Sequence, residues 1–190
     1  MSMMKIFALL ILLLFQSCGG GTTTGNPVSP IQLRMEDRQP FALIKRSWDL
    51  LIAPAHAAAT GVKFCFKRLR FKPDAVTNGS NFDLAIGEVD IIPGGFNLLT
   101  VSLPHGTYER VEFDLEKECD GTLLKPSVSF TNGAAFSSQD HITIKFEGTY
   151  VVGASGTLTL DIDPLFDALD LVASDNDIKP FLEAATGDFP

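Results

Sequence analysis

The chain has 190 residues, of which 45% are hydrophobic, and its formal net charge is −8. This length and composition suit one globular domain with additional terminal segments. From Pro73 to the end there are 20 acidic and 5 basic side chains. Such an acidic body argues against nucleic acid as a partner, because binding to phosphates needs clustered cations.

The first segment, residues 1–17, has the pattern of a secretory signal peptide. An unbroken apolar run from Ile6 to Phe15 follows the single cation Lys5. A helix that spans a bilayer needs about 20 apolar residues, so this run is too short to cross but suits a cleaved leader. A simple cleavage nearby and an uncleaved anchor are the alternatives.

The leader ends in Phe15-Gln16-Ser17-Cys18, which resembles a bacterial lipobox with phenylalanine where that family prefers leucine. The resemblance implies that the Cys18 thiol receives a diacylglyceryl group and that the chain is cut before it. Cys18 then becomes an acylated N-terminus, and two or more acyl chains give stable attachment to a membrane. Gly19 after the cysteine resembles the pattern of Gram-negative lipoproteins that are sent to the outer membrane.

Two segments separate the leader from the main domain. Residues 18–35 begin with an uncharged Gly- and Thr-rich stretch, which predicts a lipidated flexible tether. Residues 36–60 predict a connector with an amphipathic helix from Pro40 to Ile52. The apolar face of that helix carries Phe41, Ile44, Trp48, Leu51 and Ile52. We expect the helix to pack on the domain; contact with the membrane surface is the alternative.

From Gly61 the apolar residues alternate with a period of two, which predicts β-strands. The alternating positions are Val62, Phe64, Phe66, Leu69, Phe71, Phe82, Leu84, Ile86, Val89, Ile91, Leu99, Val101, Leu103, Val111, Phe113, Leu115, Val128, Phe130, Ile142, Ile144, Phe146, Leu158, Leu160 and Ile162. The phase slips at Lys67-Arg68, which predicts a bulge. Seven or eight short strands with turns between them predict an all-β fold, either a β-sandwich or a barrel. We expect a single antiparallel β-sandwich over residues 61–190.

A short C-terminal helix follows the last predicted strand. Asp163 is expected to cap it and Pro164 to occupy its first position. The stretch from Ile178 to Leu182 is expected to return and cover the sandwich.

Cys65 and Cys119 remain as an even pair once Cys18 carries lipid. In the oxidising surroundings of an exported protein such a pair predicts a disulfide, which would pin the loop after Leu115 onto the outer side of the Cys65 strand. Closing this loop of about 54 residues stabilises the fold by roughly 4 kcal/mol in the chain-entropy model.

A basic cluster lies on the first long predicted strand. Its members are Lys63, Lys67, Arg68, Arg70 and Lys72. The cluster would bind an anion or lipid headgroups in one interpretation. The favoured interpretation is the solvated face of a strand that pairs with acidic neighbours.

A family resemblance begins in residues 103–115, LPHGTYERVEFDL, which resemble the turn and strand of transthyretin-like (prealbumin-like) sandwiches. Motifs of a family of uncharacterised bacterial lipoproteins with that fold are similar to the stretches HITIKFEGTYVV (141–152), LTLDID (158–163) and IKP (178–180). The resemblance implies a transthyretin-like fold and an envelope location, while that family's activity is undefined. Gly106 would allow the tight turn after Pro104, and the Tyr108 hydroxyl would tie the corner.

No catalytic set is apparent, so we expect neither an enzyme nor a cofactor or metal. His56, His105 and His141 have no metal-ligand spacing, and Ser155 lacks the GxSxG context. The acidic C-terminal segment is the remaining candidate site, because oxygen clusters hold Ca²⁺. Its carboxylates are Asp161, Asp163, Asp167, Asp170, Asp175 and Asp177. The EF-hand spacing is absent, and capping or turn roles explain several of these residues.

The patterns together predict a non-catalytic lipoprotein of the envelope, anchored to the outer membrane by lipid. Its sandwich would serve as a structural or protein-interaction module with an envelope protein as partner. The alternative is a carbohydrate-binding module on the cell surface. Platforms for sugars need exposed tryptophan or tyrosine, and the chain offers only Trp48, Tyr108 and Tyr150.

Overall fold

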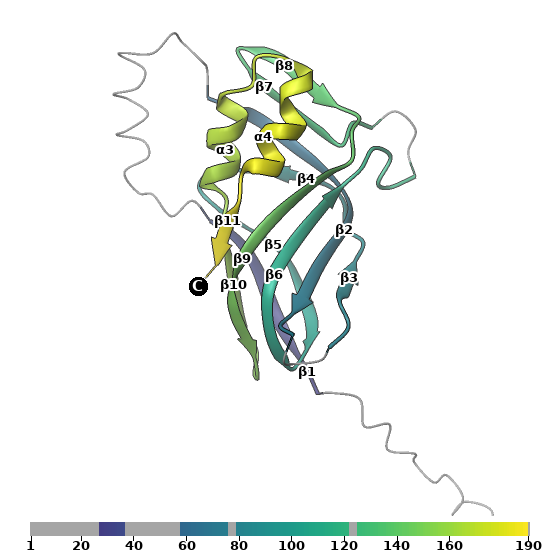
Figure 1. Cartoon of the computed structure of the whole chain (residues 1–190), viewed down its shortest axis with the longest axis vertical. Coiled ribbons are helices and arrows are strands. Elements are labelled where there is room, and N and C mark those ends of the chain that lie inside the picture. Colours follow the sequence, from purple (N-terminus) through teal and green to yellow (C-terminus); the bar gives the residue numbers. More distant parts are fainter. Residues whose placement is uncertain (1–26, 37–57, 76–78, 122–124, 190) are drawn as a thin grey trace, which may run out of the picture.

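The computed structural model describes residues 27–36, 58–75, 79–121 and 125–189, which form a mostly β fold with two sheets (Figure 1). The predicted signal peptide, the lipid-attachment residue Cys18 and the predicted helix from Pro40 to Ile52 lie outside the described residues.

The smaller sheet has three strands in the order β10-β1-β5. These strands are β10 (Gly156–Asp161), β1 (Val28–Glu36) and β5 (Phe96–Pro104). The central strand β1 runs parallel to β10 and antiparallel to β5. Its alternating residues Ile31, Leu33 and Met35 are fully buried, so one face of this sheet is apolar.

The larger sheet has the order β11-β9-β6-β2-β7-β8, with β3 and β4 also paired to β2. Its strands are β2 (Thr60–Pro73), β3 (Phe82–Leu84), β4 (Gly87–Ile91), β6 (Gly106–Leu115), β7 (Val128–Asn132), β8 (Ala134–Ser138), β9 (Ile142–Val152) and β11 (Gly187–Phe189). All pairs are antiparallel except β11 with β9. Strand β2 therefore pairs with four other strands of this sheet: β3, β4, β6 and β7.

The core consists of apolar side chains from both sheets. Its phenylalanine rings contact one another across the large sheet: the centroids of Phe66 and Phe113 lie 5.0 Å apart, and those of Phe113 and Phe146 lie 4.7 Å apart. All three rings are fully buried. Aromatic pairs at such distances add about 0.5–1.5 kcal/mol each beyond the area they bury.

The predicted bulge at Lys67-Arg68 is confirmed, because the register of β2 against β6 shifts between Phe66 and Arg68. Leu69 and Phe71 are out of phase with the apolar alternation before Phe66, so in a regular strand they would face outward. The bulge corrects the phase, and both side chains are fully buried.

Two short α-helices lie close together at one end of the molecule, near β7 and β8 (Figure 1). They are α3 (Asp163–Asp170) and α4 (Ile178–Ala184), joined through the 3-10 turn η1 (Asp175–Asp177). Pro164 stands in the first turn of α3, as predicted, but Asp163 is not the cap. The carboxylate of Asp161, the last residue of β10, accepts a hydrogen bond from the Asp163 N–H at 3.0 Å instead.

The β-rich prediction is confirmed, and the strand count and the pairing need correction. The described residues contain eleven strands instead of seven or eight, and the pairs β1–β10 and β9–β11 are parallel. The short strand β11 escapes a period-two search because it has only three residues. A side chain at Gly187 would overlap the Phe146 ring, so glycine permits the close approach of β11 to β9.

The predicted boundary of the sandwich at residue 61 is wrong. Residues 28–35, assigned to the tether, belong to β1, which lies between two other strands. Glu36 ends that strand, and Thr60, assigned with it to the connector, begins β2. The apolar alternation of β1 is short and contains Pro30, which lacks the N–H that a strand normally donates. The free energy gained by burying the alternating apolar side chains outweighs the loss of this one hydrogen-bond donor.

The predicted disulfide between Cys65 and Cys119 is present, with the two Cα atoms 5.4 Å apart. The Cys119 N–H also donates a hydrogen bond to the Cys65 sulfur at 3.0 Å, and the Glu116 N–H donates to the Cys65 carbonyl at 3.0 Å. The turn that follows β6 is thus fixed to β2, as the sequence predicted.

Replacing one core side chain of β1 tests whether this strand belongs to the folded domain. We expect Leu33→Ala to lower the free energy of unfolding by about 2–5 kcal/mol, because it leaves a cavity between the sheets. The matched control is Gln32→Ala on the other face of β1, with an expected change below about 1 kcal/mol. Urea unfolding of both variants measures this; equal stabilities would show that β1 is not part of the core.

Candidate functional site

The outer face of the large sheet carries a layer of charged side chains, centred on two carboxylates of β6. Glu112 and Asp114 alternate with the core residues Val111, Phe113 and Leu115, so they point away from the core. Each carboxylate side chain is nevertheless only 8% exposed. Long side chains of the neighbouring strands cover them, and we call this group the outer ion-pair layer.

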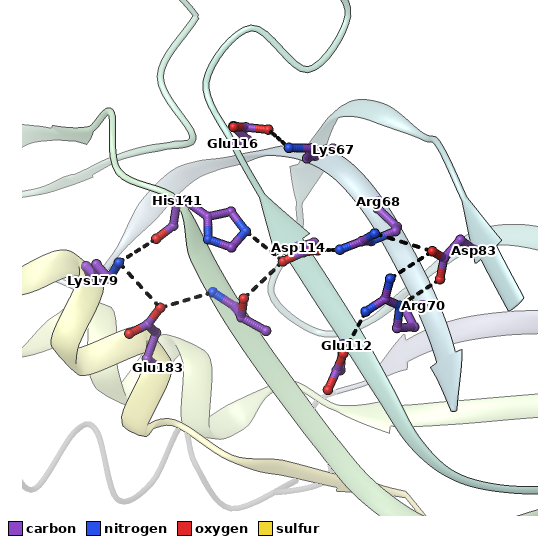
Figure 2. A network of polar contacts seen from close by, with 11 residues as sticks. Lys67, Arg68, Arg70, Asp83, Glu112, Asp114, Glu116, His141, Lys179 and Glu183 are labelled. Carbon is purple, nitrogen blue, oxygen red and sulfur yellow. Dashed lines mark hydrogen bonds and ion pairs between the residues drawn. The ribbon is translucent and has the colours of Figure 1, made fainter. Parts of the chain in front are cut away.

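Asp114 receives donors from the strands on both sides, as Figure 2 shows for Arg68 and His141. Arg68 of β2 forms an ion pair with it. The His141 Nε2 lies 2.8 Å from one carboxylate oxygen, and the Thr143 hydroxyl donates to the same oxygen at 3.0 Å. This carboxylate therefore joins β2, β6 and the start of β9.

Glu112 and Asp83 complete the layer. The Lys72 Nζ lies 2.7 Å from a Glu112 oxygen, and Arg110 approaches the same oxygen at 3.5 Å. The Arg70 guanidinium donates two hydrogen bonds to Asp83, at 2.8 and 2.9 Å (Figure 2). Such a bidentate pair fixes the short strand β3 to β2.

The ionisation of the layer follows from these contacts. Burial by itself raises the pKa of Asp114, but hydrogen bonds from Arg68, Thr143 and His141 outweigh burial and lower that pKa below its ordinary value of 3.8. The hydrogen bond from Arg70 lowers the pKa of Asp83. The bond to Asp83 likewise raises the pKa of Arg70. Asp114, Asp83 and Arg70 are therefore charged at neutral pH.

The favoured interpretation of the basic cluster, pairing with acidic neighbours, is confirmed. Lys63 lies 3.4 Å from Asp90 and 3.9 Å from Glu88 on β4, and Lys67 pairs with Glu116. Arg68, Arg70 and Lys72 belong to the outer ion-pair layer. Each of the five cations has an acidic partner, so their charges serve the pairing of strands.

Three aspartates of the acidic C-terminal segment have separate structural partners. Asp170 accepts a hydrogen bond from the Ala59 N–H at 2.6 Å, and Asp175 accepts one from the Ser137 N–H at 2.9 Å. Asp177 accepts from Ser174 at the start of the η1 turn. In the part of the chain that the structure describes, no group of three or more His, Cys, Asp or Glu side chains could hold a metal ion.

The remaining residues that the sequence singled out are spread over the fold. His56 and Trp48 lie outside the described residues. The His105 Nε2 lies 2.8 Å from the Ser29 hydroxyl, far along the sheet from His141. Ser155 lies in the turn between β9 and β10.

The two tyrosines give no support to a sugar-binding row among the described residues. Tyr108 is 4% exposed, and its hydroxyl donates a hydrogen bond to the Pro104 carbonyl at 2.9 Å, as the sequence predicted. Tyr150 is only partly exposed. Burial raises the pKa of both hydroxyls.

Sequence reasoning missed the burial of Glu112 and Asp114. The available signal was the alternation of carboxylates on one central strand opposite a basic strand. Burial itself depends on the side chains of β2 and β9, whose pairing with β6 the sequence does not specify.

No family model, curated protein or solved structure matches the chain. Within the described residues, no helix combines the length and the apolar character needed to span a membrane.

The outer ion-pair layer predicts a specific loss of stability in acid. Since the pKa of Asp114 is lowered in the folded state, its contribution is complete above the ordinary value of 3.8 and disappears as the pH falls through the lower folded value. We expect Asp114→Asn to lower the free energy of unfolding by about 1–3 kcal/mol at pH 7. Its stability should also fall less between pH 4 and the acid limit, which urea unfolding at a series of pH values would measure.

Asp90→Asn is the matched control, because the Asp90 side chain is 69% exposed and pairs with Lys63 at the surface. Exposed pairs contribute about 0–1 kcal/mol. If the two variants were equally stable at pH 7 and equally sensitive to acid, the outer ion-pair layer would not hold the sheet.

Proposed function

We propose that the chain is an exported lipoprotein of the bacterial envelope, held at the outer membrane by acyl chains on Cys18. Its tethered β-sandwich acts without catalysis, as a structural or protein-interaction module. The observation that carries the proposal is the Cys65–Cys119 disulfide, in a chain whose first 18 residues have the pattern of a lipoprotein leader.

The disulfide supports export because such bonds persist in oxidising compartments and are rare in the cytosol. Cys65 is 1% exposed and lies between two core phenylalanines along β2. The bond joins this buried residue to Cys119, which is half-buried. It also leaves Cys18 as the single remaining cysteine of the chain.

The attachment of β1 supports a tethered domain. The Pro27 carbonyl accepts a hydrogen bond from the His105 N–H at 2.8 Å, and the Ser29 hydroxyl contacts the His105 ring. The chain therefore enters the sandwich at the corner between β5 and β6. Nine Cα–Cα steps lead from Cys18 to Pro27, which gives the tether a reach of at most about 30 Å.

The charged face supports a structural role over a catalytic one. The side chains of the outer ion-pair layer are engaged with one another across four strands. Their common effect is to hold β3, β2, β6 and β9 together. A catalytic site would instead direct titratable groups towards a shared pocket.

We also propose that the sandwich is transthyretin-like. Support comes from the hydrogen bond of Tyr108 to Pro104 at the turn between β5 and β6, in the stretch that resembles this family. Gly106, which we expected to allow the tight turn after Pro104, has a positive φ of 153°.

The anchor is tested by removing its thiol. We expect Cys18→Ala to move the protein from the membrane fraction into the soluble fraction, because the acyl chains can no longer be attached. Thr22→Ala, in the same tether, should stay with the membranes. Retention of Cys18→Ala on membranes washed with high salt would show that lipid on Cys18 is not the anchor.

The redox state is tested on protein recovered from the envelope. We expect digestion without reductant to yield a peptide pair joined through Cys65 and Cys119, detected by mass spectrometry and separated by reduction. Two free thiols at these positions in envelope material would contradict export into an oxidising compartment.

A further inference from the structure

Strand β5 forms an open edge of the small sheet. Among the described elements, β1 alone runs alongside it, and the opposite edge of β5 has no partner strand. An open edge presents a row of backbone N–H and C=O groups that can pair with another strand. Natural proteins block such edges with charges, prolines, bulges or covering segments.

The other edges in the described part of the chain carry those blocks. Strand β8 is covered by η1 and α4, and its Ser137 N–H donates to Asp175. Strands β3 and β4 carry the charges of Asp83, Glu88 and Asp90. Strand β10 lies against β11 and β9, and β11 has three residues.

Strand β5 lacks a block over its C-terminal half. None of its nine residues is charged. The register against β1 skips Leu98, which marks a bulge, and Pro104 ends the strand. Between these two positions, Leu99 to Leu103 pair regularly with β1 and leave an uncharged edge without a bulge.

We propose that this edge pairs with β5 of a second copy of the chain, antiparallel and about a twofold axis, so that two small sheets become one six-stranded sheet. With Val101 on the axis, Thr100 lies opposite Ser102 of the second copy on the exposed face. Leu99 lies opposite Leu103 of the second copy on the core side. This register keeps apolar residues on one face and hydroxyls on the other, because facing residues of an antiparallel pair share a face.

A second copy suits this edge better than an arbitrary strand. An antiparallel strand paired with itself is self-complementary, and a strand without charges brings no like charges together. If the proposed lipid anchor holds both copies on one membrane surface, their local concentration rises as well. The dimer itself does not depend on that anchor, because the edge belongs to the folded domain.

The test uses the full chain purified in detergent and measures its mass by analytical ultracentrifugation over a range of concentrations. We expect a monomer–dimer equilibrium for the unmodified chain. Thr100→Lys should raise the dissociation constant at least about tenfold, because it places charges at the pairing edge. Thr157→Lys is the matched control: Thr157 and Thr100 flank Gln32 in the same row of the sheet, on opposite edges. This control should dimerise like the unmodified chain.

Amide hydrogen exchange supplies a second readout that does not require a variant. We expect the amides of residues 99–103 in the unmodified chain to exchange more slowly as the protein concentration rises. A monomer at every concentration, or equal dissociation constants for Thr100→Lys and the unmodified chain, would overturn the dimer. Either result would leave the membrane fractionation of Cys18→Ala unaffected, so failure of the dimer and failure of the anchor are distinguishable.

Discussion

Strand β1 lies between β10 and β5 and holds the small sheet together. Without β1, the strands β5 and β10 would share no neighbour, and the small sheet would not exist. Ile31, Leu33 and Met35 present the apolar face of that sheet, which covers the phenylalanines of the large sheet. A sheet with one apolar face is stable only when another layer covers that face.

In the large sheet, the central strand β6 is buried on both faces. The inner face buries Phe113 among aromatic rings, and the outer face buries Glu112 and Asp114 under cations of β2 and a hydroxyl of β9. Removing one partner of a buried ion pair costs far more than removing an exposed pair. The outer ion-pair layer is thus committed to strand pairing, and the dimer that we propose uses the β5 edge instead.

Features that depend on local periodicity could be predicted from the sequence, and features that depend on distant neighbours could not. The bulge after Phe66, the pairing of the basic cluster and the disulfide follow from alternation, charge and cysteine count. Strand β1 was assigned to a tether because Pro30 and the preceding Gly- and Thr-rich stretch obscure its alternation. The burial of Glu112 and Asp114 was missed for a related reason, since it depends on which strands flank β6.

The start of β1 also limits the length of the proposed tether. We propose that lipid on Cys18 holds the sandwich within about 30 Å of a membrane. Intact-mass spectrometry of the protein extracted from the envelope tests this anchor. We expect a chain that begins at Cys18 and carries the added mass of a diacylglyceryl group. A chain that still begins at Met1, or a mature chain with an unmodified Cys18, would contradict it.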